Sequence, residues 1–326
     1  MSAHRKMLPR LLRRAVLACL CIAGTALAQS QRNAQIVVAF TPGGPVDFVA
    51  RLIAEPLGRE LGQTVVVENR AGANGNIGAE YVAKAAPDGA VMFLSSVGAI
   101  AISPALYSPL PYDPVRDFAP VSVVVNNSTV FVVNVSNPAN SAAEFVADTI
   151  KAAQPTPFGS SGSGSTPHLT LELLQAATGA KLLHVPYKGA AQVITDVLAG
   201  RVAGFLGDLP GFIGQIKGGK LKAIAVAAPR RHTLLPEVKT FAEQGINGVE
   251  SNNWYALLVP AKTARATVDA INRGLRAALG NESVRTRLRD SGAEPAASSP
   301  EELAALIKAD AAKWSRIIRE KNIKAD

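Results

Sequence analysis

The stretch Phe40-Thr41-Pro42-Gly43-Gly44-Pro45-Val46-Asp47 decides the fold that this sequence predicts. An apolar, β-branched run precedes it and a segment with helical spacing of apolar residues follows, which predicts strand, tight turn and helix. Gly43 and Gly44 permit backbone angles that a side chain would forbid, and Asp47 suits a helix N-cap or first turn. Such a turn directs free backbone N–H groups toward one point beside a helix N-terminus, which favours a carboxylate or phosphate. An ordinary capped turn is the alternative that these residues leave open.

The residues after this turn alternate between strand and helix patterns. Strands are expected over 36–40, 65–69 and 91–95, and helices over 47–62 and 79–86. Pro56 lies inside the first of these helices, where its missing N–H predicts a kink or a short break. This order, with short links, predicts an α/β, doubly wound parallel sheet in which ligands bind at the carboxyl ends of strands.

Two β-rich runs in the middle of the chain, 121–125 and 130–135, are predicted to be separate strands. Asn126-Asn127-Ser128 separates them, and the crossing into a second domain is expected there. The run 254–260 is predicted to be the strand that returns to the first domain. Amphipathic helices that complete the first domain are expected over 267–279, 283–291 and 300–320.

A run of glycine and serine at 158–168 leads into a helix expected over 169–178. Ser165 or Thr166 suits the cap and Pro167 suits the first turn, so this run predicts a second helix N-terminus that favours an anion. A flexible linker is the alternative interpretation of the run. His168 is expected to be a hydrogen-bonded structural residue, with a base or a ligand contact as the alternative roles.

Residues 1–28 are predicted to be a signal peptide that directs export of the protein. Five basic residues precede the apolar run 15–28, which ends in the small-residue pattern Ala26-Leu27-Ala28, so Gln29 would begin the mature chain. Both cysteines lie within this leader, at 19 and 21, and lipoprotein cleavage before one of them is the alternative. No later apolar stretch is long enough for a transmembrane helix.

The mature chain excludes several classes of function. It would have no cysteine, and therefore no disulfide, thiol nucleophile or thiolate metal site. Its net charge falls from +9 to +4 because the leader carries five basic and no acidic residues, and its dispersed Lys and Arg do not indicate a nucleic-acid binder. The glycines of 72–78 lack dinucleotide-binding spacing, no zinc motif occurs, and 158–168 lacks Gly-x-Ser-x-Gly. No cofactor, no metal and no catalytic residue are therefore expected.

Short motifs follow one another in a fixed order along the mature chain. They include PGGPVD at 42–47, VENR at 67–70, GNIGAE at 75–80, APDG at 86–89, YSPLPYD at 107–113, GSTPHL at 164–169, VPYKG at 185–189, DVLAGRV at 196–202, GGKLKAIA at 218–225 and FAEQG at 241–245. In this order they resemble the periplasmic substrate-binding proteins of tripartite tricarboxylate transporters, also called Bug receptors.

The resemblance implies a two-lobed periplasmic-binding-protein fold of type II, the Venus-flytrap fold, with a central sheet flanked by helices in each lobe. The first lobe would comprise 29–126 and 254–326, and the second lobe 127–253. A small carboxylate or dicarboxylate would lie between the lobes, held by backbone N–H groups, hydroxyls and bridging waters. The ligand-binding positions implied by the resemblance are Gly43, Gly44, Pro45, Asp47, Ser95, Ser96, Ser163, Ser165, Thr166, His168, Tyr187, Lys188, Gly189 and Asp208.

The implied function is that of an extracytoplasmic solute-binding protein, not an enzyme. The protein would deliver its ligand to integral-membrane transporter subunits and would be a monomer that does not itself span the membrane. One alternative is a soluble sensor of the same fold that signals to a membrane partner. The other is an exported hydrolase that uses a serine or histidine of the glycine-rich cleft.

Overall fold

The computed structural model describes residues 33–324 of the 326-residue chain. The predicted signal peptide, 1–28, therefore lies outside the described residues. The elements below belong to the compact unit that begins at Ala34.

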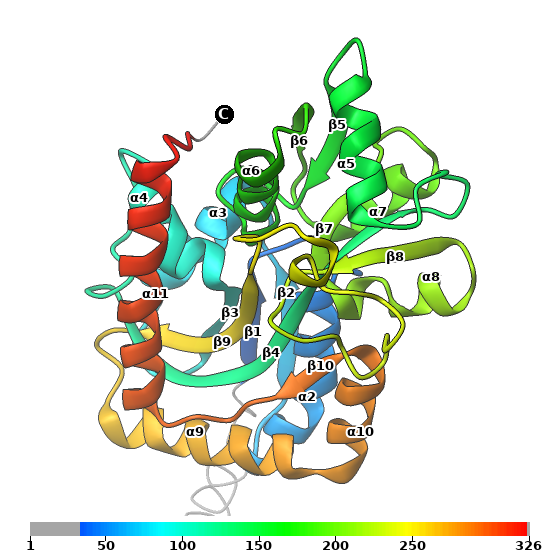
Figure 1. The fold of residues 1–326 in the computed structure, drawn as a ribbon. Coiled ribbons are helices and arrows are strands. Elements are labelled where there is room, and N and C mark those ends of the chain that lie inside the picture. Colours follow the sequence, from blue (N-terminus) through cyan, green and yellow to red (C-terminus); the bar gives the residue numbers. More distant parts are fainter. Residues whose placement is uncertain (1–32, 325–326) are drawn as a thin grey trace, which may run out of the picture. The chain divides into compact units, whose positions relative to one another are not determined.

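The first half of the sheet is built as the strand–helix alternation predicts (Figure 1). Strand β1 (Ala34–Val38) pairs in parallel with β2 (Val65–Asn69) on one side and β3 (Val91–Ser96) on the other. Helix α2 (Pro45–Leu61) links β1 to β2, and α3 (Asn76–Ala83) lies between β2 and β3. The parallel, doubly wound arrangement of these strands is confirmed.

Helix α2 runs unbroken through Pro56, so the predicted short break is wrong. Ile53 and Leu57, on either side of the proline, are fully buried. Burial of apolar side chains before and after Pro56 holds both turns against the sheet and offsets the single lost hydrogen bond.

Strand β4 (Phe118–Asn134) corrects the prediction of two separate strands. Residues 118–128 pair with the antiparallel strand β9 (Asn252–Pro260), and residues 129–134 pair with β7 (Phe205–Asp208) and β8 (Leu221–Val226). The backbone groups of 126–128 are therefore satisfied by neighbouring strands, which outweighs the low strand propensity of asparagine. Register shifts within 120–125 show that the strand is irregular there. Strand β4 carries the chain from one half of the sheet to the other.

The second half of the sheet contains β5 (Thr156–Ser160) and β6 (Leu182–Pro186), which are parallel. Successive residues of β4 point to opposite faces and meet different cores. Phe131 packs against Phe145 and Phe158 on one face, while Val130 and Val132 belong to a cluster on the other. The helices of this half are α5 (Ala142–Lys151), α6 (Thr166–Thr178), α7 (Ala190–Leu198) and α8 (Ile213–Lys217).

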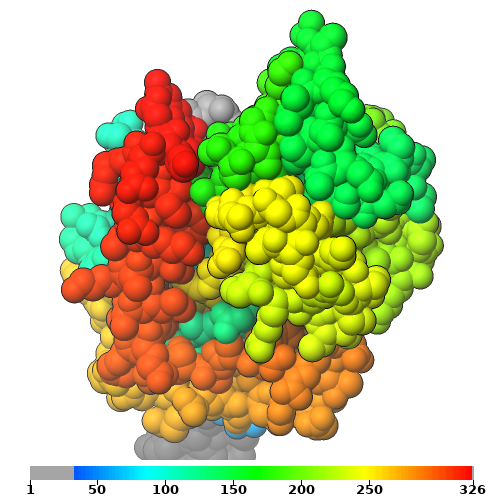
Figure 2. All heavy atoms as spheres, in the orientation of Figure 1, coloured from blue at the N-terminus to red at the C-terminus, as the bar shows by residue number. Residues whose placement is uncertain are grey.

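The C-terminal elements return to the first half. They are α9 (Arg265–Gly280), α10 (Glu282–Ser291), the short strand β10 (Ala293–Pro295) and α11 (Pro300–Glu320). Helix α11 begins where the sequence predicts, and a capping box formed by Ser299 and Glu302 fixes that start. The face shown in Figure 2 has α11, in red, beside green segments of the second half. Leu169 and Leu173 of α6 accordingly belong to the same buried cluster as α11.

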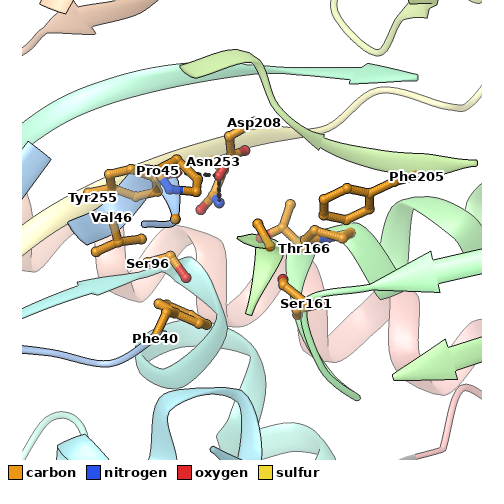
Figure 3. Close-up of a pocket in the computed structure, with 14 residues that line it drawn as sticks. Phe40, Pro45, Val46, Ser96, Ser161, Thr166, Phe205, Asp208, Asn253 and Tyr255 are labelled. Carbon is orange, nitrogen blue, oxygen red and sulfur yellow. Dashed lines mark hydrogen bonds between the residues drawn. The ribbon is translucent and has the colours of Figure 1, made fainter. Parts of the chain in front are cut away.

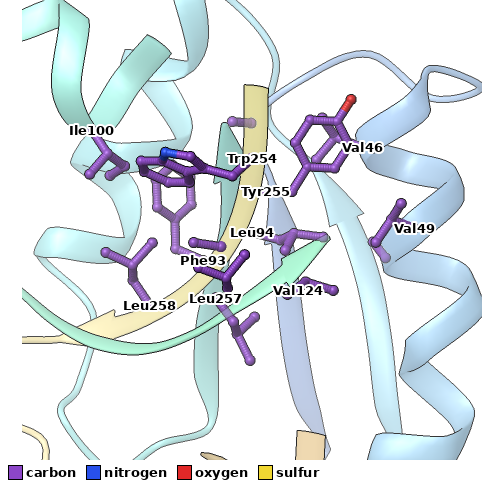
Figure 4. Packing of buried hydrophobic residues seen from close by; sticks show 14 of the residues in the cluster. Val46, Val49, Phe93, Leu94, Ile100, Val124, Trp254, Tyr255, Leu257 and Leu258 are labelled. Carbon is purple, nitrogen blue, oxygen red and sulfur yellow. The ribbon is translucent and has the colours of Figure 1, made fainter. Parts of the chain in front are cut away.

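Strand β9 lies in the middle of the buried hydrophobic cluster that also contains residues of β1 and β3 (Figure 4). Trp254 is fully buried, and its indole N–H donates to Asp310 of α11 over 2.7 Å. The neighbouring residues Asn253 and Tyr255 belong to the opposite face of the strand. Both faces of β9 are buried, because Tyr255 and Leu257 belong to the same hydrophobic cluster as Trp254, and Asn253 and Tyr255 also line the site described next.

Short helical segments between the strands were not foreseen from the sequence. They are a 3-10 turn at Ala73–Gly75, a π-helical segment at Gly98–Ile102, helix α4 (Ser103–Leu106), and 3-10 turns at Leu209–Gly211 and Ala242–Gln244.

Candidate ligand-binding pocket

A pocket lies where three helices begin (Figure 3). Gly44 caps α2, Ser165 caps α6 and Gly189 caps α7. The first N–H groups of a helix have no partner within it and stand at the positive end of its dipole, so three such ends favour an anion. The cavity volume of the pocket is about 20 Å³, which is close to the space that one water molecule needs. The lining residues are Phe40, Gly44, Pro45, Val46, Ser96, Ser161, Ser165, Thr166, Pro167, Ala190, Phe205, Asp208, Asn253 and Tyr255.

The polar side chains of the pocket are mostly hydroxyls. Among the described residues that line it, none is a lysine, arginine or histidine. Thr166 is 1% exposed, and its hydroxyl has no hydrogen-bond partner among the described residues. An anion in this pocket would be held by helix ends, hydroxyls and backbone N–H groups, without a cationic side chain.

Asp47 braces the first loop from inside. Its Oδ2 accepts hydrogen bonds from Gly43 N at 3.0 Å and Arg51 Nε at 2.9 Å, and its Oδ1 accepts one from Asn69 Nδ2 at 2.9 Å. Burial would raise the pKa of Asp47, but these donors outweigh it and hold the pKa below its usual value. The sequence allowed Asp47 to be an N-cap or first-turn residue, and the structure places it in the first turn.

The glycine-rich loop before α6 is held by its own side chains, so a flexible linker is wrong. Ser165 Oγ accepts from His168 N at 3.3 Å, and His168 Nδ1 accepts from Gly164 N at 3.0 Å. The His168 ring stacks on His184, with centroids 4.0 Å apart. These contacts match the structural role expected for His168, which is 3% exposed and does not line the pocket.

A serine and a histidine of the same region hydrogen-bond to each other outside the pocket lining. Ser160 Oγ lies 2.5 Å from His184 Nε2 and also accepts from Gly162 N. Ser160 is fully buried, so its hydroxyl is not presented to a substrate. This geometry gives no support to a serine hydrolase.

The loop before α7 lies against the loop at 41–45. Tyr187 donates its hydroxyl to Asp196 Oδ2 at 2.7 Å, and burial together with Asp196 raises the pKa of Tyr187 to about 12. Lys188 is exposed, and its backbone N–H donates to the side chain of Gln192. A Cβ atom at Gly189 would collide with the Thr41 side chain, so glycine permits this close approach.

Asp208 lies at the end of β7 and contacts two residues of β9. Its Oδ2 accepts from Asn253 Nδ2 at 2.7 Å and from the Tyr255 hydroxyl at 2.6 Å. Burial raises the pKa of Asp208 to about 6, and the two hydrogen bonds oppose this rise. Burial and the nearby Asp208 raise the pKa of Tyr255 well above its usual value, which keeps its hydroxyl protonated.

The structure brings together only part of the predicted site. The predicted residues that line the pocket are Gly44, Pro45, Ser96, Ser165, Thr166 and Asp208. Those outside its lining are Gly43, Asp47, Ser95, Ser163, His168, Tyr187, Lys188 and Gly189. Ser95 precedes Ser96 in β3, so its side chain points to the opposite face. A ligand contact for any of these residues stays a prediction.

Asn253 and Tyr255 were not predicted as site residues, although their spacing in the sequence could have indicated them. They flank Trp254 in a strand, and a period of two places both on the face opposite the buried indole. Sequence analysis also missed Asn74, which has a left-handed backbone (φ 55°) and donates through Nδ2 to Gly164 O at 2.8 Å. Nothing in the sequence near Asn74 indicates that partner, which lies 90 residues away.

Comparison with known proteins decides the family. Residues 49–323 match the family described as tripartite tricarboxylate transporter family receptor. The chain belongs to this receptor family. The resemblance to Bug receptors is thereby confirmed.

Three solved structures resemble this receptor closely over nearly their whole length. The periplasmic binding protein BugD is 33% identical, with 90% of this chain and 99% of that chain covered and a TM-score of 0.86. An R. palustris protein solved with adipate is 34% identical, with 91% and 100% covered and a TM-score of 0.87. MatC from Rhodopseudomonas palustris, with bound malate, is 29% identical, with 88% and 98% covered and a TM-score of 0.84. The periplasmic-binding-protein fold is therefore confirmed, and the family is one of solute-binding receptors.

The described residues contain neither a membrane-spanning helix nor a metal-binding cluster. Within 33–324, no helix combines the length and apolar character needed to cross a bilayer. The same residues contain no group of three or more His, Cys, Asp or Glu side chains placed to hold a metal ion.

Proposed function

We propose that this receptor captures a small carboxylate or dicarboxylate in the pocket at the three helix ends and delivers it to a tripartite tricarboxylate-type membrane transporter. The observation that carries the proposal is the convergence of the N-termini of α2, α6 and α7 on one pocket that lacks a lining cation among the described residues. The adipate and malate bound by two relatives support a carboxylate as the ligand.

The helix ends would contribute favourably to the binding of an anion. Each favours an anion by ~0.3–1 kcal/mol when exposed and by up to ~2 kcal/mol when partly buried. Hydrogen bonds to a charged group contribute ~1.5–3 kcal/mol each. Two or three such bonds together with the helix dipoles would contribute several kcal/mol to holding one carboxylate.

Binding requires the facing loops to separate. A cavity of about 20 Å³ does not admit a dicarboxylate, so the loop at 41–45 must move away from the loops that precede α6 and α7. We take 29–126 with 254–326 as one lobe and 127–253 as the other, with β4 and β9 as the connections that bend. A ligand that touches both sides then shifts an existing equilibrium toward the closed form.

The same proposal includes the location and the partners. The receptor would act in the periplasm after removal of residues 1–28, as a monomer, and its closed form would be recognised by the membrane subunits of the transporter. Membership of a family of receptors supports a binding role rather than catalysis.

Calorimetry on protein that lacks residues 1–28 and has been stripped of carried-over ligand tests the proposal. The panel is a series of mono- and dicarboxylates of three to six carbons, with the corresponding amides as uncharged controls. At least one acid should bind with one-to-one stoichiometry and raise Tm, while its amide does neither. Absence of heat and of any change in Tm across the whole panel would overturn the proposal.

A further inference from the structure

Asp208 is the one carboxylate that lines the pocket among the described residues. It is 7% exposed, and no lining cation offsets its charge. The carboxylate of Asp208 would repel an anionic ligand group placed close to it, so its presence in this pocket is unfavourable for a plain carboxylate. The two oxygens of Asp208 differ in their surroundings.

Oδ2 is fully occupied and Oδ1 is not. Asn253 Nδ2 and the Tyr255 hydroxyl both donate to Oδ2, at 2.7 and 2.6 Å. Oδ1 is buried and has no hydrogen-bond partner among the described residues. A buried polar atom without a partner is unfavourable, so a ligand group that pairs with Oδ1 gains more than the same group would gain in water.

The neighbours of Asp208 leave its Oδ1 as a hydrogen-bond acceptor. Val97 N donates to Asn253 Oδ1 at 3.4 Å, which turns Nδ2 of that amide toward Asp208. Tyr255 uses its single hydroxyl hydrogen on Oδ2. With both neighbours committed as donors to Oδ2, the ionised carboxylate offers only an acceptor at Oδ1.

We propose that Asp208 Oδ1 makes the receptor select acids that carry a hydrogen-bond donor, namely amino acids and hydroxy acids, over plain carboxylates of the same length. This inference rests on the proposed function and narrows its ligand class. The ligand carboxylate lies at the helix ends, and its ammonium or hydroxyl group donates to Oδ1. A plain dicarboxylate would leave Oδ1 unpaired or bring a second negative charge toward it.

Matched trios of acids test the selectivity without any mutation. Each trio keeps the carbon chain and changes one substituent: propionate, lactate and alanine; succinate, malate and aspartate; glutarate, 2-hydroxyglutarate and glutamate. In the trio that binds most tightly, calorimetry should show at least a ~10-fold lower Kd for the hydroxy or amino acid than for the plain acid. The Kd values of the hydroxy acid and the amino acid within that trio show whether the pocket prefers a hydroxyl or an ammonium donor.

Asp208→Asn is the decisive variant because it keeps the shape of the side chain. Its amide oxygen can accept the two existing hydrogen bonds, and its NH₂ then replaces the acceptor Oδ1 with a donor. The Kd of the amino acid should rise at least ~10-fold, while that of the plain acid stays the same or falls. Asp196→Asn is the matched control, since Asp196 also accepts a tyrosine hydroxyl but does not line the pocket. Its selectivity should equal that of the unmodified protein.

Two results overturn the inference while leaving the proposed function intact. One is a plain acid that binds the unmodified protein as tightly as its hydroxy and amino counterparts. The other is an Asp208→Asn protein that loses affinity equally for all three members of a trio. If neither any acid of the trios nor any other acid of the three- to six-carbon panel binds, the proposed function itself fails.

Discussion

Two hydrogen bonds should hold the closed form of this receptor together outside the pocket. Asn74 Nδ2 donates to Gly164 O at 2.8 Å, and the Tyr107 hydroxyl donates to Ser163 O at 2.7 Å. Both join the first half of the molecule to the loop that precedes α6. We expect Asn74→Gly to weaken carboxylate binding, because glycine keeps the left-handed backbone of residue 74 without strain and removes only the side chain.

The size of the effect follows from the burial of the bond. Asn74 is 3% exposed, and its Nδ2 donates both to Gly164 O and, over 3.3 Å, to Ser103 Oγ in the first half. Of these two bonds only the one to Gly164 O crosses to the loop before α6, and its loss leaves that carbonyl without this donor. Such a loss amounts to ~1–3 kcal/mol, and if it falls on the closed form alone it raises Kd by ~5–150-fold. Tyr107→Phe leaves a half-buried acceptor and should raise Kd by ~2–10-fold.

Calorimetric titration measures Kd, and small-angle scattering of the free and liganded proteins reports how far they close. Tyr81→Phe is the matched control, because the Tyr81 hydroxyl accepts from Gln35 within the first half and joins no loops across the pocket. If Asn74→Gly and Tyr107→Phe bind the ligand as tightly as the Tyr81→Phe protein does, these bonds do not stabilise the closed form and the reasoning is refuted.

Three further predictions concern single residues. Asp47→Asn should lower the free energy of unfolding by ~1–3 kcal/mol at pH 7. The folded pKa lies below the ordinary value of 3.8, so this difference should shrink as the pH falls from 3.8 through the lowered pKa. A difference that stays constant down to the lowest pH at which both proteins fold would contradict the prediction. Burial raises the pKa of Asp208 to about 6, so ionisation of this carboxyl opposes folding fully above pH 6 and not at all below pH 3.8. Asp208→Asn should therefore raise Tm at pH 8 and leave it nearly unchanged at pH 3.5. An equal change of Tm at the two pH values would contradict the destabilising effect of the buried charge. Thr166→Val should raise the Kd of the ligand by ~3–10-fold, because it removes a hydroxyl that would bond to the ligand. Its Tm should stay unchanged or rise, since Oγ1 has no partner among the described residues. Equal affinity of the two proteins would exclude that hydroxyl from the ligand contacts.

The local chemistry of the turns was predictable from the sequence, while the meeting of distant loops was not. Gly44-Pro45 and Ser165 with Pro167 carry their capping preferences within a few residues, so two helix N-termini could be placed without coordinates. Strand β4 was predicted to break at 126–128 because local propensity disfavours a strand there, and the partners that override it are distant, at 252–254 in β9 and 293–294 in β10.

Asp208 and Asp47 show the same limit within the site. Both are carboxylates near glycine turns, and sequence analysis gave both a ligand contact. The structure surrounds Asp47 with three donors that satisfy it, whereas it leaves one oxygen of Asp208 without a partner. The difference depends on Asn69 and Tyr255, which neither residue's own neighbourhood reveals.

Backbone amide resonances test most directly whether helix ends hold the ligand. In ¹H–¹⁵N spectra recorded as the tightest-binding carboxylate is added, the amides of Val46, Thr166 and Ala190, at the starts of α2, α6 and α7, should show the largest downfield proton shifts. Saturation of binding with those three amides unmoved would contradict the account.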